Sequence, residues 1–372
     1  MSMSTDSDNQ FMQRAISLSL RGLGNTAPNP NVGCIIVAPD GNIVGRGWTS
    51  PTGRPHAETN ALEQAGTNAK GATAYITLEP CSHYGKTPPC AESLINAGIS
   101  RAVIGTKDPS PHVNGQGINL LKQAGIDITL GVCENDARQA MAGFFKVLEY
   151  QRPYTTLKLA TSADGYIAWP DGNSKWITGE RAREFSHLLR AQNDAMLIGV
   201  GTVLADNPSL TCRLPDLEKQ SPIRIIADSR LRTPPSSNII TSASQETPTW
   251  ILHDENHANS HKITKSNVTL LPQPIDQSNH LDIKKALTTL AQRGITRLLS
   301  EGGSHLAASL IKNNLVDELI WIKAPIIIGE GGLPAIYDQE IATLLNKGKW
   351  KKGEQFMLDK DTITHFFYKD SN

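Results

Sequence analysis

The sequence carries no surplus of charge of either sign. Its 372 residues include 36 lysines and arginines and 36 aspartates and glutamates, so the formal net charge at pH 7 is +0. A protein that binds nucleic acid along its phosphate backbone usually has a clear excess of basic residues. The balance therefore favours a small-molecule partner over nucleic acid.

Long apolar stretches and the features of a secreted protein are also missing. No run approaches the ~18 apolar residues that a membrane-spanning helix requires, and the first ten residues, MSMSTDSDNQ, lack the basic start and apolar core of a signal peptide. The 5 cysteines are odd in number and dispersed. This usage is typical of a reducing compartment, so we expect a cytoplasmic protein that does not bind a membrane.

What is present is the composition of a folded globular protein, with 39% hydrophobic and 19% charged residues. The chain is longer than one hydrophobic core usually supports, and a length of about 150 residues per domain suggests two domains. A helical pattern at 134–150 ends where a new strand pattern begins. We therefore expect one domain at 1–150 and a second at 151–372.

Strand and helix patterns alternate in both halves of the chain. A hairpin pattern at 31–48 and a helical pattern from His56 precede alternating strand and helix patterns at 71–80, 90–99, 101–109, 115–126 and 127–132. The second half continues in the same way, from a strand pattern at 151–168 to a helical pattern at 304–315. Such alternation predicts an α/β fold with layered sheets, the second of the doubly wound kind.

Four residues indicate a metal site in the first half. His56 and Glu58 stand two apart at the start of a helical pattern, and Cys81 and Cys90 each follow a proline near the expected start of a helix. Helix starts favour the thiolate form of cysteine, which is the form that binds metal. One imidazole and two sulfurs would leave one position of a tetrahedral Zn²⁺ open for water, as in catalytic zinc sites. Glu58 would lie beside the metal and transfer protons, as in the zinc-dependent nucleobase deaminases.

Each of these residues alone also has a purely structural interpretation, in which His56 caps a helix or packs, Glu58 is a solvated first-turn acid and the cysteines are buried thiols. Their occurrence in order on successive strand–helix units favours the zinc site. The usual deaminase signature separates its cysteines by two residues, whereas eight residues, SHYGKTPP, intervene here. That insertion brings His83 and Lys86 to the rim of the expected site, where they suit a phosphorylated or polar substrate.

Four stretches of the first half resemble the N-terminal half of the bifunctional deaminase–reductases of riboflavin biosynthesis. They are PNPNVGCIIV, PHAETNAL, TLEPCSHYGKTPPC and GTKDPSP. In that family the long spacing between the cysteines is normal. The resemblance implies a cytidine-deaminase-like αβα domain in the first half, with substrate contacts from Asn29, His83 and Lys86.

The second half resembles the reductase half of the same family, whose fold is like that of dihydrofolate reductase. The matching stretches are TLKLATSADGYIA, SKWITGE, IGVGTVLADNPSLTCR and EGGSHLAASLI. Considered without the family, GVGTVLADNP is a weak dinucleotide signal, because Leu204 replaces the third glycine of G-x-G-x-x-G. The strand, two glycines and helix start in LLSEGGSHLAASLI form a better signal, because backbone N–H groups at a helix start bind pyrophosphate. An ordinary strand-to-helix turn is the alternative interpretation.

The resemblance also implies which residues of the second half hold ligands. The expected NADPH contacts are Ala160, Ser174, Trp176, Thr202, Asp206, Gly303, Ser304, His305, Leu306, Ala307, Ala308 and Ser309. The expected substrate contacts are Ser174, Arg190, Leu210, Arg213 and Glu301, of which the two arginines suit a phosphate. Lys158, Asp206 and Glu301 are expected nearest to the reacting sugar carbon, with the proton donor left open among them. Candidates for holding the 2′-phosphate of NADPH are Ser229, Arg230 and Arg232.

Together these features predict a cytoplasmic bifunctional enzyme of riboflavin synthesis. Its zinc domain would remove the 2-amino group of 2,5-diamino-6-ribosylamino-4(3H)-pyrimidinone 5′-phosphate. Its second domain would reduce the ribosyl chain to ribityl with NADPH, giving 5-amino-6-ribitylaminouracil 5′-phosphate. We expect one Zn²⁺ per deaminase domain and a homo-oligomer, either a dimer or a tetramer.

Two alternatives remain open from the sequence. One is a tRNA or nucleotide deaminase of the same zinc fold, with the second half as a binding module. The other is a non-catalytic scaffold in which His83 or Cys34 completes a closed, structural zinc site.

Overall fold

The computed structural model describes residues 5–84, 88–110, 113–175, 177–257, 263, 265–346 and 348–369. The chain divides into two compact units, residues 1–151 and 152–372. This division lies next to the junction that the sequence indicated, where one helical pattern ends and a strand pattern begins. Each unit has its own main sheet and its own buried core.

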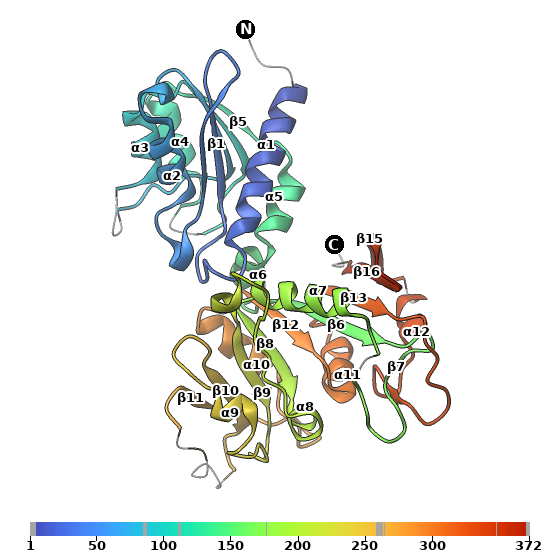
Figure 1. The fold of residues 1–372 in the computed structure, drawn as a ribbon. Helices are drawn as coiled ribbons and strands as arrows, with labels where there is room; N and C mark the ends of the chain where they lie inside the picture. Colours follow the sequence, from blue (N-terminus) through green and yellow to red (C-terminus); the bar gives the residue numbers. More distant parts are fainter. Residues whose placement is uncertain are drawn as a thin grey trace. The chain divides into compact units, whose positions relative to one another are not determined.

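The first unit is built on a five-stranded sheet with the order β2-β1-β3-β4-β5. Its strands are β1 (Gly33–Val37), β2 (Ile43–Trp48), β3 (Thr73–Leu78), β4 (Arg101–Thr106) and β5 (Asp127–Leu130). Strand β1 pairs antiparallel with β2 and β3, whereas β3, β4 and β5 run parallel. The helices are α1 (Thr5–Ser19), α2 (Ala57–Ala65), α3 (Cys90–Asn96), α4 (Gln116–Gln123), α5 (Glu134–Ala140) and α6 (Ala142–Tyr150). Helices α1 and α5 cover one face of the sheet, and α2, α3 and α4 cover the other (Figure 1). The unit therefore has three layers, with the sheet between two layers of helices.

Burial on both faces explains the sequences of the central strands in this unit. Every residue of β1 is buried, and so is every residue of β3 except the first. Strands that are covered on both faces are apolar along their length rather than alternately apolar and polar. The layered arrangement confirms the α/β fold class expected for the first half.

Two glycines allow the close packing that positions the candidate site. A Cβ atom at Gly47 of β2 would lie 2.0 Å from the carbonyl oxygen of Ala57, the first residue of α2. A Cβ atom at Gly117 of α4 would lie 1.9 Å from the carbonyl oxygen of Pro80. Only glycine, which has no Cβ, fits at such separations. These contacts fix the start of α2 and the turn that carries Cys81.

The second unit is built on a nine-stranded sheet with the order β11-β10-β9-β8-β12-β6-β13-β16-β15, and β7 and β14 form a small separate sheet. Its strands are β6 (Tyr154–Thr161), β7 (Tyr166–Ala168), β8 (Ala195–Gly199), β9 (Ile223–Ala227), β10 (Thr249–Asp254), β11 (Val268–Gln273), β12 (Arg297–Glu301), β13 (Glu318–Lys323), β14 (Leu333–Pro334), β15 (Trp350–Leu358) and β16 (Asp361–Tyr368). The strands from β11 to β13 run parallel, and β16 and β15 continue the sheet antiparallel. The helices are α7 (Glu180–Ala191), α8 (Val200–Asp206), α9 (Asn238–Thr241), α10 (Ile283–Gln292), α11 (Ser304–Lys312) and α12 (Ile341–Asn346). No helix in the described part of the chain is long and apolar enough to cross a membrane.

The large sheet separates two hydrophobic cores. Neighbouring residues of β8 belong to different cores, because successive side chains of a strand point to opposite faces. Leu197 belongs to the core that α10 and α11 cover, whereas Met196 and Ile198 belong to the core that α7, α8 and α9 cover. Helices on both faces of a largely parallel sheet confirm the doubly wound α/β architecture expected for the second half.

Some elements differ from the sequence expectation. The helix expected at 134–150 is interrupted at Met141, whose φ of −104° and ψ of 23° separate α5 from α6. Several elements were not predicted from the sequence, namely α1, α7, α8, α9, α12, β13, β14, β15 and β16. Strand β15 shows why: it exposes the consecutive residues 351–355, and therefore has no apolar alternation for sequence reasoning to detect.

We expect Gly117→Ala to destabilise the first unit, although alanine normally stabilises a helix interior by about 0.5–1 kcal/mol relative to glycine. The added Cβ would meet the Pro80 carbonyl oxygen at 1.9 Å, and overpacking of this kind costs about 1–3 kcal/mol. Urea unfolding measures the change. The control is Gly201→Ala in α8, where no described atom lies within 4 Å of the added Cβ. Equal effects of the two substitutions would contradict the packing argument.

Candidate active sites

His56 and Glu58 lie at the start of α2, where the sequence analysis placed them. His56 is the residue before the helix, with extended backbone angles (φ −70°, ψ 162°), and its side chain does not cap the helix. Glu58 lies in the first turn and is only 4% exposed. Capping by the His56 side chain and solvation of Glu58, two of the structural interpretations, are therefore wrong.

The two cysteines reach the same point from a strand end and from a second helix. Cys81 follows β3 by way of Glu79 and Pro80, and Cys90 is the first residue of α3, after Pro89. The backbone N–H of Cys90 donates a hydrogen bond to the Cys81 sulfur over 3.3 Å. Because an N–H group at a helix start stabilises a thiolate, the local structure favours the anionic form of Cys81.

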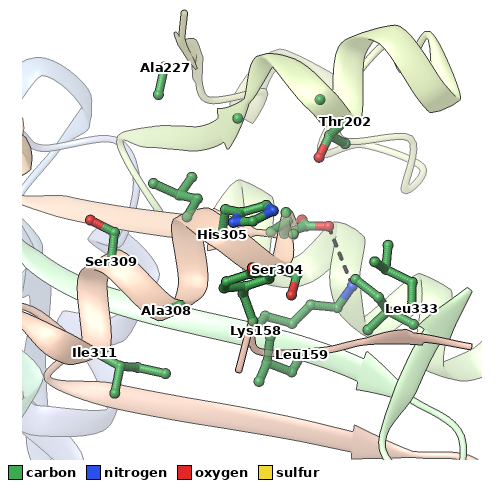
Figure 2. Close-up of a pocket in the computed structure, with 18 of the residues that line it drawn as sticks. Lys158, Leu159, Thr202, Ala227, Ser304, His305, Ala308, Ser309, Ile311 and Leu333 are labelled. Atoms are coloured by element: carbon green, nitrogen blue, oxygen red, sulfur yellow. Dashed lines mark hydrogen bonds and ion pairs between the residues drawn. The ribbon is translucent and has the colours of Figure 1, made fainter. Parts of the chain in front are cut away.

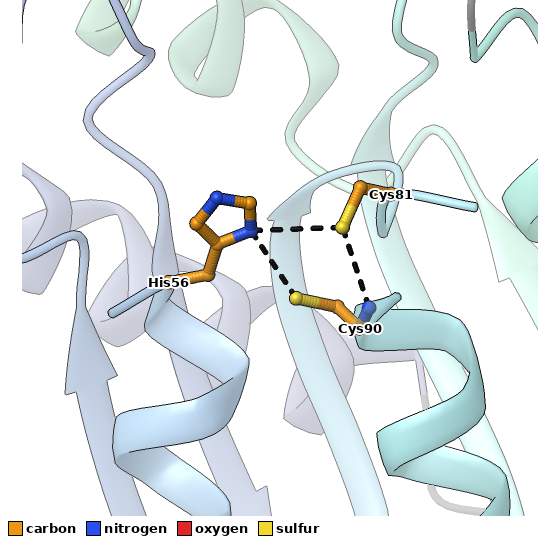
Figure 3. A group of neighbouring side chains, drawn as sticks. All are labelled: His56, Cys81 and Cys90. Carbon is orange, nitrogen blue, oxygen red and sulfur yellow. Dashed lines mark hydrogen bonds between the residues drawn. The ribbon is translucent and has the colours of Figure 1, made fainter. Parts of the chain in front are cut away.

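Three potential ligand atoms converge on one point (Figure 3). The His56 Nδ1 atom lies 3.3 Å from the Cys90 sulfur and 3.6 Å from the Cys81 sulfur. A tetrahedral zinc ion, with bonds of ~2.0–2.3 Å, holds such donors roughly 3.5 Å apart. All three atoms lie within 4.8 Å of one another, and no fourth histidine, cysteine or carboxylate of the described residues joins them. The donor set therefore fits Zn²⁺, and within the described residues its fourth position is not taken by a protein ligand.

Charge is unevenly distributed in this cluster. Hydrogen bonds from Cys90 and His56 lower the pKa of Cys81 to about 4, and the bond to Cys81 together with burial raises the pKa of Cys90. Burial, reinforced by the charge of Cys81, raises the pKa of Glu58 to about 7. One sulfur is therefore an anion at neutral pH, and a bound cation would displace the proton of the other.

Two of the three expected substrate contacts of the first unit lie within the described residues. Asn29 packs against Gly53, in the turn just before α2, where an added Cβ would lie 2.0 Å from the Asn29 Nδ2 atom. His83 is exposed, in the segment between the two cysteines. Lys86 lies outside the described residues.

A buried carboxylate that the sequence analysis missed fastens the base of the site. Glu79, the residue after β3, is 3% exposed. It accepts backbone hydrogen bonds from Asp108 (3.3 Å), Gly115 (3.0 Å) and Ile118 (3.2 Å). Glu79 thereby ties the strand end that leads to Cys81 to the start of α4. The available signal was an acid placed between an apolar strand pattern and a Pro-Cys pair.

The second unit contains an open cleft of about 1890 Å³ at the carboxyl ends of its parallel strands. Ligands of doubly wound sheets bind at this position. The turns after β8 and β12 line the cleft, together with parts of β6 and α11. In Figure 2, Thr202 of α8 lies on one side, with His305 and Ser309 of α11 and Lys158 of β6 on the other.

A buried group of three charges lies in this cleft. Glu301, the last residue of β12, pairs with Arg190 of α7 through two contacts of 2.7 and 2.9 Å. The Nζ atom of Lys158 lies 3.5 Å from the same carboxylate. Burial alone would raise the pKa of Glu301, but the charges of Arg190 and Lys158 outweigh it and lower the pKa to about 2. Glu301 is therefore a fixed anion between two cations.

The turn between β12 and α11 is shaped to receive an anion. Gly302 and Gly303 have φ angles of 96° and 87°, a conformation that favours glycine. The Thr202 hydroxyl faces this turn, 3.6 Å from the position of a Cβ at Gly303. The Ser304 Oγ atom, in the first turn of α11, is buried with no hydrogen-bond partner in the described part of the chain. Backbone N–H groups at a helix start and an unpaired hydroxyl fit a pyrophosphate group.

Most residues expected at the second site line the cleft. These are Ala160, Ser174, Thr202, Asp206, Ser229, Gly303, Ser304, His305, Leu306, Ala308 and Ser309 of the expected cofactor contacts, and Ser174, Arg190, Leu210, Arg213 and Glu301 of the expected substrate contacts. Ala307 is an exception, because it is 1% exposed and its side chain belongs to the hydrophobic core beneath α11. Of the other two candidates for the 2′-phosphate, Arg232 lines the cleft and Arg230 is not among its described lining residues. Trp176 lies outside the described residues.

Arg190 has a partner that the sequence analysis did not foresee. Arg190 was expected to bind a phosphate through two nitrogen atoms, but in the structure two of its nitrogen atoms donate to the carboxylate of Glu301. Its Nη1 atom donates to the Thr211 carbonyl over 3.2 Å. Arg213, in contrast, is exposed in the cleft. The structure thus separates one arginine held by a carboxylate from one that is open to a ligand.

Two further polar features complete the cleft. Asp206 accepts a hydrogen bond from Ser174 over 3.0 Å, so these two expected cofactor contacts form a pair. His187 also lines the cleft, and the sequence analysis missed it. Its position three residues before Arg190 on α7, which places both on one helix face, was the available signal.

Comparison with known proteins identifies the family. Residues 5–106 match the cytidine and deoxycytidylate deaminase zinc-binding region, and residues 153–358 match the RibD C-terminal domain. The chain is 39% identical over 359 residues to the riboflavin biosynthesis protein RibD of Aquifex aeolicus (strain VF5), which covers 96% of this chain and 98% of that protein. It is 43% identical over 333 residues to the RibD protein of Escherichia coli (strain K12), with 87% of this chain and 89% of that protein covered.

Solved structures agree with this match over both units. Acinetobacter baumannii RibD, form 1, aligns with a TM-score of 0.86 and 36% identity, covering 99% of this chain and 100% of that chain. A diaminohydroxyphosphoribosylaminopyrimidine deaminase/5-amino-6-(5-phosphoribosylamino)uracil reductase from Thermotoga maritima aligns with a TM-score of 0.85 and 32% identity, covering 98% and 99%. The zinc-binding region and the reductase domain thus coincide with the metal-ligand cluster and the cleft. The chain belongs to the RibD family and is a bifunctional pyrimidine deaminase and ribosylamino reductase of riboflavin biosynthesis.

Proposed function

We propose that the first unit binds one Zn²⁺ through His56, Cys81 and Cys90 for the deamination step. The observation that carries this proposal is the convergence of three soft or borderline donor atoms within 4.8 Å of one another. A zinc ion with three protein ligands keeps an open position and lowers the pKa of water bound there to ~7. A closed structural site would need a fourth protein ligand, and neither Cys34 nor His83 belongs to the described cluster.

Glu58 is the residue that we assign to proton transfer in this step. Its carboxyl group is buried and its pKa is raised to about 7, so it gains and loses a proton readily at neutral pH. In the proposed reaction Glu58 accepts a proton from the attacking water and donates it to the departing 2-amino group, which leaves as ammonia. Asn29, His83 and Lys86 would hold 2,5-diamino-6-ribosylamino-4(3H)-pyrimidinone 5′-phosphate for this step.

For the reduction step, we propose that NADPH binds in the cleft of the second unit, with its pyrophosphate at the start of α11. The glycine turn before this helix and the unpaired Ser304 hydroxyl support this placement. Ser229 and Arg232 line the same cleft and supply groups for a 2′-phosphate, which supports NADPH over NADH. The bound cofactor supplies the hydride that is added to C1′ of the opened ribosyl chain.

Lys158 is the residue that we assign to supply a proton during the reduction. Addition of a hydride to C1′ leaves negative charge on the adjoining atom, which a nearby acid must neutralise. Glu301, with a pKa lowered to about 2, holds no proton at neutral pH. It instead holds the ammonium group of Lys158 in the cleft, 3.5 Å from its carboxylate.

The substrate phosphate and the order of the steps complete the proposal. Arg213, which is exposed in the cleft, would bind the 5′-phosphate. Deamination followed by reduction gives 5-amino-6-ribitylaminouracil 5′-phosphate.

We also propose a cytoplasmic homo-oligomer, since α/β domains commonly pair through a sheet edge or helix face. The tRNA or nucleotide deaminase alternative is wrong, because residues 153–358 match the RibD C-terminal domain.

We expect Glu58→Gln to abolish ammonia release while the zinc content stays at the wild-type level. Glutamine keeps the size of the side chain but cannot exchange a proton, and loss of such a group typically lowers the rate about 10²–10⁴-fold. Cys90→Ser serves as the contrasting variant and should lose both zinc and activity. Mass-spectrometric metal analysis and an ammonia assay give the two readouts. Zinc loss in Glu58→Gln would show that Glu58 is a ligand and reject its assigned role.

Glu301→Gln should abolish reduction and destabilise the second unit by about 3–5 kcal/mol, because it leaves Arg190 and Lys158 buried without their anion. The stability that Glu301 contributes is fully present above its ordinary pKa of 4.5 and is lost as the pH falls through about 2. The control is Asp317→Asn, which breaks a similarly buried pair with Arg152 at 2.6 Å. It should lower stability comparably and leave NADPH oxidation intact. Normal reduction by Glu301→Gln would contradict the assignment.

A fragment of residues 152–372 should fold and bind NADPH without the first unit. Both cores and all described lining residues of the cleft lie within this unit. Circular dichroism checks the folding, and quenching of intrinsic fluorescence during titration with NADPH measures the binding. A folded fragment that does not bind NADPH would argue against a cofactor site contained in this unit.

A further inference from the structure

The segment Ser209–Arg213, called here the cleft strap, carries a strained residue into the reductase cleft. Leu210 and Arg213 of this strap line the cleft. Leu210 is 6% exposed and has a φ of 56°, in the left-handed region that branched residues rarely adopt. Such a conformation costs about 1–3 kcal/mol and persists only where surrounding contacts enforce it. The strap must therefore be held from outside.

Arg224 of β9 holds the first carbonyl of the strap. Its side chain is 0% exposed and is among the largest fully buried side chains of the described residues. The Nη1 atom donates to the Ser209 carbonyl over 3.2 Å and to the Ser242 hydroxyl over 2.7 Å. The Nη2 atom donates to the Thr247 carbonyl over 2.7 Å. Burial alone lowers the pKa of Arg224 to about 10, because no described acid lies close enough to compensate it.

Stability does not explain why this position holds an arginine. A buried guanidinium without a counter-ion carries a desolvation cost that an apolar side chain of similar length would avoid. What the guanidinium supplies is geometry, because its rigid planar fork fixes several acceptors in set directions. Here the fork joins the Ser209 carbonyl to Ser242 and Thr247, and so fixes the start of the cleft strap.

His187 of α7 holds the strap on the other side of Leu210. Its Nδ1 atom lies 3.0 Å from the Thr211 carbonyl, which also accepts a hydrogen bond from Arg190. The Nη1 atom of Arg190, which is also a donor, lies farther from Nδ1, at 3.5 Å. Since a carbonyl can only accept, the shorter contact assigns the proton of the ring to Nδ1. Burial, together with the charges of Arg190 and Arg213, lowers the pKa of His187 to about 4. The ring is therefore neutral at pH 7, and Arg213 is close enough to influence it.

We propose that Arg224 and His187 are positioning residues of the reductase site. They hold the two carbonyls that flank Leu210, and the cleft strap in turn keeps Arg213 directed at the substrate phosphate. The inference rests on the proposed function in one respect, the assignment of Arg213 to that phosphate. It predicts that affinity for the phosphorylated substrate depends on these two residues, whereas cofactor binding does not.

The test uses the full-length, zinc-loaded protein and compares Arg224→Met with Arg213→Met. NADPH oxidation is followed with the deaminated pyrimidine substrate and with the same compound lacking its 5′-phosphate. Both variants should raise KM for the phosphorylated substrate about tenfold, the effect of losing one charge-assisted contact. For both, kcat, the Kd of NADPH and KM for the compound without phosphate should stay within about twofold of wild type.

A matched pair of substitutions at His187 keeps the proposal testable if Arg224→Met does not fold. In His187→Asn, the amide N–H replaces the Nδ1–H donor at nearly the same distance along the side chain, whereas His187→Leu has no donor. His187→Leu should raise KM as Arg224→Met does, and His187→Asn should remain near wild type. The half-buried position of His187 on α7 makes these substitutions mild for folding.

Three results would overturn the proposal, and they are distinguishable. If Arg213→Met raises KM but Arg224→Met and His187→Leu do not, the phosphate assignment stands and the positioning role is wrong. If Arg213→Met leaves KM unchanged, the phosphate assignment itself fails, and the positioning role fails with it. A fall in kcat or in NADPH affinity without a change in KM would indicate general structural damage and also reject a positioning role.

Discussion

Both candidate sites depend on one constraint, the close approach of a helix start to the carboxyl end of a parallel strand. In the first unit, this approach brings the backbone N–H of Cys90 to the sulfur of Cys81, a residue that closely follows the end of β3. In the second unit, it brings the start of α11 to the end of β12 across Gly302 and Gly303. N–H groups at such points stabilise anions, a thiolate in the first unit and, in the function proposed above, a pyrophosphate in the second. Glycine makes the packing possible, since a side chain at Gly47 or Gly117 would push the supporting helices off the sheet.

Around these helix starts, burial tunes two glutamates in opposite directions. Glu58 is buried beside a sulfur anion, which raises its pKa to about 7 and suits it to proton exchange. Glu301 is also largely buried, but it lies between Arg190 and Lys158, which lower its pKa to about 2. The same type of side chain is thus suited to exchange a proton in one unit and to hold a cation in the other, and its neighbours decide which. Burial also matters at the cleft strap, where the buried guanidinium of Arg224 fixes the backbone geometry rather than adding stability.

The sequence predicted the features that local chemistry determines. His56, Glu58, Cys81 and Cys90 could be singled out because each stands at a recognisable start of a helix or end of a strand, and the layered α/β fold followed from alternating patterns. What it could not predict depends on partners far away in the chain. The carboxylate partner of Arg190 lies 111 residues further on, and Ala307 faces the core although its neighbours face the cleft. The role of Arg224 and the left-handed conformation of Leu210 gave no signal either, because an isolated arginine in an apolar strand pattern does not reveal which carbonyls it will meet.

The proposed deamination step depends on a metal ion with three protein ligands and one open position, and X-ray absorption spectroscopy at the zinc edge of the full-length protein measures this coordination directly. The predicted result is two sulfur ligands at ~2.3 Å, one imidazole nitrogen at ~2.0–2.1 Å and one further light atom that is not imidazole. A third sulfur, which Cys34 would supply, or a second imidazole, which His83 would supply, would show a closed site. Either result would contradict a zinc-bound water as the source of the hydrolytic step.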